Sequence, residues 1–203
     1  TGAGAVYCSR AYEPWAGALE QKLKQALAER HVDFKRYGGT LIAEPERLRT
    51  GAGDPYRVYT PFWRALSSTI EVPRPFPAPE TVRGLRKKIA GDTVRDWQLE
   101  PAKPDWAKGF RAAWRPGEAG AHERLAAFVD GPLATYHEER DQPDSDGTSR
   151  LSPHLHFGEV SPAQCWMAAV ARLGNVPAKS KGLETFLKEL GWREFSYHLL
   201  HHW

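Results

Sequence analysis

The first 40 residues carry a strand–helix–strand pattern, and this pattern constrains the fold most strongly. Ala5–Ser9 is a short apolar run, and Val32–Tyr37 alternates loosely until Gly38 ends it. Between them the leucines of Leu19–Leu27 recur every four residues, as on one face of a helix over residues 16–30. Strands joined by a helical crossover pair in parallel, which predicts an α/β layer. One such unit cannot close a sheet, so we expect strands preceding this sequence to complete it.

A proline-rich stretch separates this unit from the rest of the chain. Residues 72–79 contain four prolines, which favour an extended, irregular backbone. We therefore place a linker at residues 67–104, with one short helix near Thr81–Ala90. It divides the chain into a domain of residues 1–66 and a domain of residues 105–203.

The second domain has the pattern of a helical protein. Amphipathic stretches cover residues 120–129, 132–139, 163–173 and 183–202. Ser-Pro pairs at Ser152 and Ser161 predict N-capping serines followed by prolines in the first helical position. The fold class is therefore α/β plus all-α.

Composition says more about where the protein is located than about its activity. The net charge of +3 is compatible with nucleic acid but does not argue for it. Cys8 and Cys165 form no disulfide framework, so we expect a reducing, cytoplasmic location. No apolar run approaches the ~20 residues of a membrane span. The chain starts without Met and ends in a helical pattern, so we expect both ends to be cuts in a longer protein.

A short segment before one predicted helix suits an anion. Thr148, Ser149 and Ser152 offer hydroxyls, Arg150 offers a fork of donors, and Leu151 lies between them. Backbone N–H groups and the positive end of a helix also favour negative charge, so a diphosphate would fit. The plainer interpretation is helix capping, the commonest use of Ser-Pro at a helix start.

A second cluster lies in the last helix and suits a nucleotide. Glu189 follows Phe186 by three residues, and Trp192 and Arg193 follow Glu189 by three and four, so these side chains share a region of the helix. Tryptophan stacks on bases, a carboxyl group accepts a hydrogen bond from the edge of a base, and arginine pairs with phosphate. An extruded nucleotide would use all three. The alternative is a core tryptophan beside a Glu–Arg pair within the helix.

The histidines permit a third interpretation. His154 and His156 are close in sequence, and His198, His201 and His202 share a helix face, so zinc is geometrically possible. Matched cysteines or carboxylates at metal-binding spacing are absent from the sequence. We therefore expect no metal, and interpret these residues as buried or capping histidines.

Two segments resemble a known family closely. Thr-Ser-Arg-Leu-Ser-Pro-His-Leu-His-Phe-Gly-Glu at 148–159 is similar to the flavin-binding segment of the DNA photolyase/cryptochrome family, and Leu-Lys-Glu-Leu-Gly-Trp-Arg-Glu-Phe-Ser at 187–196 is similar to its DNA-facing helix. Residues 7–15 and 55–63 resemble the end of its antenna domain. The resemblance implies the C-terminal part of a Rossmann-like parallel α/β antenna domain, a linker, and the first half of a helical FAD-binding domain.

The resemblance also implies roles for individual residues. Arg140 would face a DNA phosphate, Glu189 would hydrogen-bond the lesion, and Trp192 would pack against it. Phe186 stands where a family tryptophan often lines the flavin pocket. The residues implied in FAD binding are Tyr136, Thr148, Ser149, Arg150, Leu151, Ser152, Phe186 and Arg193, and Arg193 would also serve the phosphates of DNA.

The resemblance is nearest to class I photolyases, which use light to repair cyclobutane pyrimidine dimers. It implies FAD as the cofactor and UV-damaged DNA as the partner. A blue-light photoreceptor of the cryptochrome type is the alternative, but plant-type cryptochromes tend to lack the tryptophan that matches Trp192. An antenna chromophore, folate or deazaflavin, and a monomeric parent are implied as well. We expect the 203-residue chain alone to bind FAD weakly and to repair nothing, because later helices of the family supply the flavin-ring contacts and the tryptophan electron chain.

Overall fold

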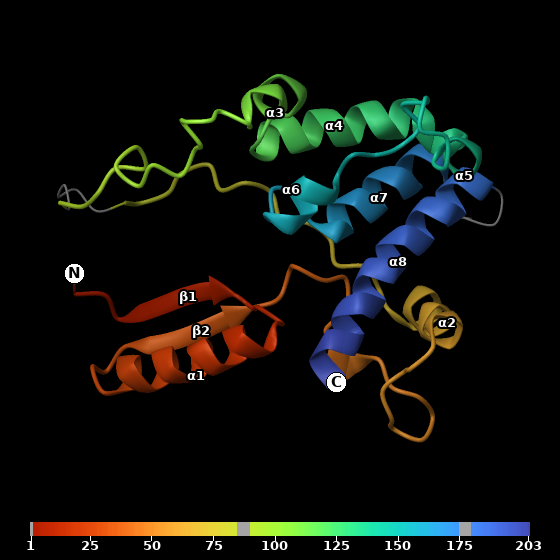
Figure 1. Cartoon of the computed structure of the whole chain (residues 1–203). Coiled ribbons are helices and arrows are strands. Elements are labelled where there is room, and N and C mark those ends of the chain that lie inside the picture. The colour runs from red at the N-terminus through yellow and green to blue at the C-terminus, as the bar shows by residue number, and fades with distance from the viewer. Residues whose placement is uncertain (1, 85–89, 175–179) are drawn as a thin grey trace.

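The N-terminal part is the predicted parallel unit. The computed structural model describes residues 2–84, 90–174 and 180–203 (Figure 1). Strands β1 (Ala5–Ser9) and β2 (Asp33–Tyr37) pair in parallel, in a register that runs from Ala5 opposite Asp33 to Ser9 opposite Tyr37. Helix α1 (Pro14–Ala28) connects them and covers one face of the pair. The strand–helix–strand prediction is confirmed, and within the described ranges the sheet has these two strands.

The other regular elements in the described ranges are helices. A short 3₁₀ turn η1 (Pro45–Arg47) leads to α2 (Tyr59–Thr69). After the linker come α3 (Lys108–Ala113), α4 (Glu118–Asp130), η2 (Pro132–Ala134), α5 (Tyr136–Glu139), α6 (Ser152–His156), α7 (Pro162–Leu173) and α8 (Lys181–His202). The amphipathic stretch predicted at 132–139 is two short elements, η2 and α5. They are separated at Thr135, whose backbone angles are those of neither element.

The linker has the extended character expected of its prolines. Among its described residues, 70–84 contain no helix or strand. Thr81–Gly84 are therefore not helical, and most of the helix predicted at Thr81–Ala90 lies at 85–89, outside the described residues. Figure 1 shows the described residues of the linker running out from the helices on either side. Helix α2 continues to Thr69 and packs on α8, and the predicted domain boundaries stay a prediction.

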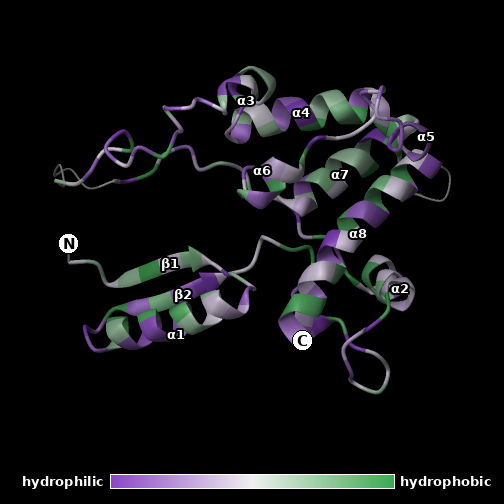
Figure 2. Ribbon diagram, viewed as in Figure 1, coloured by the Kyte–Doolittle hydropathy of each residue, from purple (hydrophilic) through white to green (hydrophobic). Residues whose placement is uncertain are grey.

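Helix α8 is the centre of the core. It contacts α2, α5, α7, η2 and η1. Its buried apolar side chains, Leu183, Phe186, Leu187, Leu190 and Phe195, join residues of α2, α4, α5 and α7 in one cluster. Figure 2 shows hydrophobic and hydrophilic residues interleaved along α8, which suits a helix that is packed on several sides and still carries polar groups.

One of the two predicted capping serines is confirmed. The Ser161 hydroxyl accepts from the Gln164 backbone N–H at 3.1 Å, and the Gln164 side-chain oxygen accepts from the Ser161 N–H at 2.8 Å, a complete capping box. The prediction for Ser152 is wrong, because α6 begins at Ser152 itself. The turn at Arg150, with φ of +50°, leaves Leu151 already in a helical conformation, whereas a capping serine needs an extended backbone.

None of the helices in the described ranges is both long and apolar enough to cross a bilayer.

The start of α8 depends on a glycine. A Cβ atom added at Gly182 would overlap the backbone carbonyl oxygens of Leu133 and Ala134. We expect Gly182→Ala to lower the free energy of unfolding by about 1–3 kcal/mol, because α8 would have to move away from η2. Gly17→Ala in α1 is the matched control, since a Cβ there meets nothing within 4 Å. The control should be neutral or stabilising by up to about 1 kcal/mol. Equal effects of both in urea denaturation would contradict this account of the contact.

Candidate functional site

Four of the predicted residues meet where α5 packs on α8. The Tyr136 ring lies edge-on to the Phe186 ring at 5.7 Å between centroids, and both rings contact Phe128 on α4. Arg140, one turn after Tyr136, places its guanidinium 5.5 Å from the centre of the Tyr136 ring and pairs with Glu189. Burial raises the pKa of the Tyr136 hydroxyl, so this group stays neutral. The structure therefore joins an aromatic wall to a charged pair.

The ion pair between Arg140 and Glu189 is partly open to solvent. The two side chains are 28% and 36% exposed, and Asp141 lies 3.4 Å from the Arg140 Nε. The hydrogen bond to Glu189 raises the pKa of Arg140. Ion pairs with this exposure stabilise a fold by about 0–1 kcal/mol. An anion can therefore compete for Arg140, and a hydrogen-bond donor can compete for Glu189.

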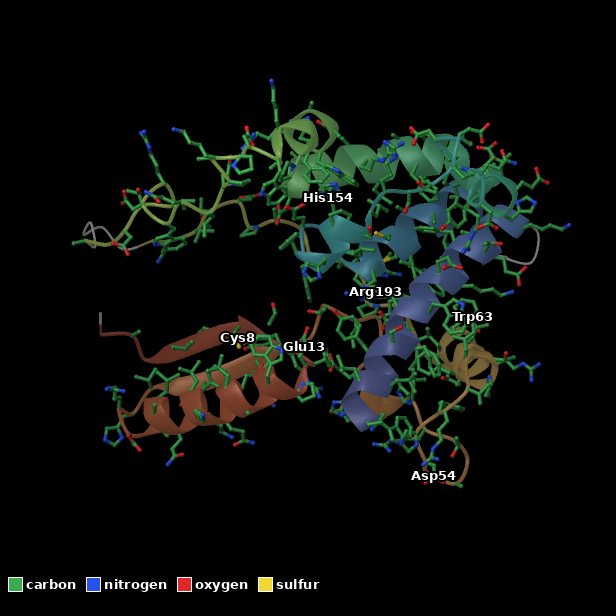
Figure 3. All side chains as sticks on the ribbon, in the orientation of Figure 1. Cys8, Glu13, Asp54, Trp63, His154 and Arg193 are labelled. Atoms are coloured by element: carbon green, nitrogen blue, oxygen red, sulfur yellow. The ribbon has the colours of Figure 1, made fainter. Side chains whose placement is uncertain are left out.

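Trp192 lies one turn beyond Glu189 on α8 and is 46% exposed. Its indole stacks on the Tyr59 ring of α2, with 3.6 Å between centroids and 8° between the planes. Trp63, also on α2, stacks on Tyr59 and lies on the same side of α8 (Figure 3). A large, half-exposed aromatic surface therefore stands beside the Arg140–Glu189 pair.

Arg193 lies on another side of α8. Its Nη1 donates to the Thr40 carbonyl at 2.8 Å and contacts Glu194 Oε1 at 3.3 Å. Figure 3 shows Arg193 and the labelled Trp63 on opposite sides of α8. The guanidinium is thus bound to the chain after β2, and the role predicted for Arg193 toward DNA and FAD stays a prediction.

Glu194 is the buried residue that the sequence interpretation missed. It is 2% exposed, and its Oε2 accepts from the backbone N–H of Ile42 at 2.8 Å and of Ala43 at 3.2 Å. Burial raises the pKa of its carboxyl to about 7, against the opposing effect of these N–H donors and of Arg193. In the sequence Glu194 looks like one more polar residue after Trp192 and Arg193. Its partners lie about 150 positions away, so no local signal identifies them.

The segment Thr148–Ser152 is held by α4. Arg124 on α4 donates through Nε to the Ser149 carbonyl at 3.1 Å, and Asp146 accepts from Arg124 at 3.3 Å and from Arg150 at 2.8 Å. Leu151 is buried in the core, while Arg150 and Ser152 are exposed. Arg124 and Arg150 also line a pocket of about 260 Å³. Hydroxyls, backbone groups and two guanidinium groups therefore gather at one loop, and Leu151 joins this loop to the core cluster that contains Tyr136 and Phe186.

Two of the histidines are part of the core. His198 is fully buried, and its Nε2 accepts from the Tyr56 backbone N–H at 3.0 Å. Burial lowers its pKa to about 4, so it is neutral near pH 7. His154 is buried as well and binds Glu159. These two fit the interpretation as core histidines, and the described residues hold no group of three or more side chains that could bind a metal ion.

Comparisons with known proteins agree on one family. A family model described as DNA photolyase matches residues 1–80. The deoxyribodipyrimidine photo-lyase of Agrobacterium fabrum is 44% identical over 202 residues, which is 100% of this chain and 42% of that protein. Cryptochrome-1 of Arabidopsis thaliana is 31% identical over 98% of this chain and 30% of its own length. A bacterial class III photolyase structure from Agrobacterium tumefaciens superimposes with a TM-score of 0.92 at 43% identity, over 100% of this chain and 42% of that one.

The family model over the first 80 residues and the relatives that match the whole chain confirm the predicted resemblance to the DNA photolyase family. The chain spans about 42% of the length of the Agrobacterium relative. The similar solved structure is named a class III photolyase, so the expectation of class I stays a prediction.

Glu194 predicts a pH dependence of stability. Its folded pKa of about 7 lies above the ~4.3 of a solvated glutamate, so between these values the folded state holds a proton that the unfolded state has released. The free energy of unfolding should therefore fall as pH rises through this window. Relative to Glu194→Gln, we expect the wild-type protein to lose up to about 3 kcal/mol between pH ~4.5 and ~7.5, measured by urea denaturation.

Glu184→Gln, a partly exposed position on the same helix, is the control and should leave the wild-type slope unchanged. If the free energy of unfolding depends on pH in the same way in the wild-type protein and in Glu194→Gln, the raised pKa of the buried Glu194 carboxyl is contradicted.

Proposed function

We propose that this protein acts as a deoxyribodipyrimidine photolyase, which uses light and FAD to repair cyclobutane pyrimidine dimers in UV-damaged DNA. The observation that carries the proposal is the row of Arg140, Glu189 and Trp192 along α5 and α8, in a chain related over its full length to proteins of that name. A cation, a hydrogen-bonding carboxyl group and a half-exposed indole match the three parts of an extruded nucleotide. The relative of cryptochrome type is less similar, at 31% identity.

We infer the finer domain organisation from the same relationship. Residues 1–66 would be the C-terminal part of the antenna domain, 67–104 the linker, and 105–203 the N-terminal part of the helical FAD-binding domain. The parallel β1–β2 pair supports the first assignment, and helices α5 and α7, which pack on α8, support the last. A second chromophore, folate or deazaflavin, would bind on the α/β unit.

The residues at the Thr148–Ser152 loop fit a flavin dinucleotide. Three hydroxyls and the Arg150 guanidinium supply donors for a diphosphate within five consecutive positions. Tyr136 and Phe186 are nearly buried, at 8% and 3% exposed, so they would support the flavin site from the core side. Phe186 keeps an aromatic group where the family often has tryptophan. When bound, FAD would supply the light-driven electron transfer to the dimer.

The other residues would bind and orient the DNA. Arg140 would exchange its partner Glu189 for a phosphate of the DNA backbone, which positions the strand without reading sequence. Glu189, released from that pair, would accept a hydrogen bond from the edge of the dimer. Trp192 would stack on the extruded bases and exclude water from one side of them. Arg193 is proposed to add positive potential toward the phosphates and FAD.

The direct test of the function is a repair assay on the complete gene product loaded with FAD. A duplex with a single pyrimidine dimer should lose the dimer under blue light and keep it in the dark. Binding of flavin without any light-dependent repair would overturn the proposal and favour the photoreceptor alternative.

The 203-residue chain should hold FAD poorly by itself, because it spans about 42% of its relative and would supply only part of the cofactor's surroundings. After incubation with FAD and desalting, we expect an absorbance spectrum with little flavin. A retained band near one flavin per chain would show that residues 136–193 bind the cofactor without further segments.

Trp192 should determine the affinity for damaged DNA. Trp192→Ala in the complete gene product should weaken binding of a dimer-containing duplex by about 1–3 kcal/mol, because one stacked contact is lost. Affinity for the same duplex without a dimer should change little. Trp15→Ala is the control, since Trp15 is also exposed but lies on α1. Equal losses for both variants in fluorescence-anisotropy titrations would contradict the assigned role.

A further inference from the structure

Tyr59 makes the closest aromatic contact of Trp192. The two rings are nearly parallel, 8° apart, with 3.6 Å between centroids. Tyr59 is the first residue of α2 and is far in sequence from α8. It lies in the segment 55–63 that resembles the family's antenna domain, but the sequence interpretation gave it no role in the site. A stack this close occupies one face of the indole. Since Trp192 is still 46% exposed, the surface left for a ligand is the remainder, and a base can stack on the opposite face alone.

The Tyr59 ring is itself held in place. Its hydroxyl donates to the Lys188 carbonyl at 2.7 Å, one turn before Trp192 on the same helix. Burial raises the pKa of this hydroxyl, so it remains a donor. The absence of a side chain at Gly191 leaves room for this contact, because a Cβ there would lie 3.0 Å from the Tyr59 oxygen and still closer to the Trp63 ring. The ring therefore has one orientation relative to α8.

An indole on an exposed helix face normally samples several rotamers, and ordering it on binding reduces affinity. A parallel ring fixed to the same helix removes that freedom before the ligand arrives. Aromatic pairs of this kind are favoured beyond their buried area. The Tyr59 ring thus acts on the ligand through Trp192 and needs no contact with the DNA.

We propose that Tyr59 is a positioning residue for Trp192: it covers one face of the indole and holds the other face ready for an extruded base, and so contributes to the discrimination between damaged and undamaged DNA. The proposal rests on the proposed function of Trp192.

The test measures the ratio of dissociation constants for an undamaged duplex and the same duplex with one pyrimidine dimer, using the complete gene product. Tyr59→Leu should lower this ratio about two- to tenfold, the value of one aromatic pair. Tyr59→Phe, which keeps the ring and loses the hydroxyl, should stay within about twofold of the wild-type ratio. In a Trp192→Ala background, Tyr59→Leu should have no further effect on the ratio.

This pattern separates positioning from a general loss of structure. Tyr7→Leu is the control, because Tyr7 is also stacked on a tyrosine, Tyr37, but lies on β1. If Tyr59→Leu fails to fold, Tyr59→Met takes its place. An unchanged ratio in Tyr59→Leu beside a reduced ratio in Trp192→Ala would overturn the inference and leave the proposed function standing. An unchanged ratio in Trp192→Ala would overturn both.

The stack also has a readout that needs no DNA. Ring protons of Trp192, assigned in NMR spectra by comparison with Trp192→Phe, should be shifted upfield by the Tyr59 ring current and should move toward ordinary positions in Tyr59→Leu. Unshifted Trp192 protons in the wild-type protein would overturn the inference.

Discussion

The attachment of residues 40–43 to α8 is the interaction on which the rest of this structure depends. Glu194 accepts from the backbone N–H groups of Ile42 and Ala43, and Arg193 donates to the Thr40 carbonyl. These bonds are buried or nearly so, where an unpaired polar group would be costly, so the segment after β2 has little freedom to leave the helix. Through these bonds, two neighbouring residues of α8 hold the chain that follows the α/β unit against the helical part.

Residues close together on α8 therefore contact different neighbouring elements. Phe186 and Glu189 belong to the contact with α5, Trp192 belongs to the contact with α2, and Arg193 with Glu194 belongs to the chain after β2. Because successive helical residues point about 100° apart, a single helix can order an aromatic wall, an ion pair and a stacked indole. A disturbance of the anchor at residues 40–43 would thus be felt at the candidate site, through the orientation of α8.

The elements that were predicted correctly are those whose signals are local. The parallel strands follow from an apolar run and a loosely alternating run on either side of a period near four, and α7 follows from Ser161, Pro162 and Gly174 at its ends. The Ser152 cap failed because a turn at Arg150 changed the backbone one residue upstream, which residue type alone does not reveal. Thr135 divided a predicted helix for a similar reason.

The sequence by itself determined the resemblance to the family, the strand–helix–strand unit, and the helices α4, α7 and α8, but it did not predict α2 or α3. These depend on spacing within one element or on a contiguous match to relatives. Tertiary structure alone decided which groups meet: Arg140 with Glu189, Tyr59 with Trp192, and Glu194 with Ile42 and Ala43. Each of these contacts joins residues that are about 50 to 150 positions apart, and their chemistry is set by burial and packing, which no local pattern encodes.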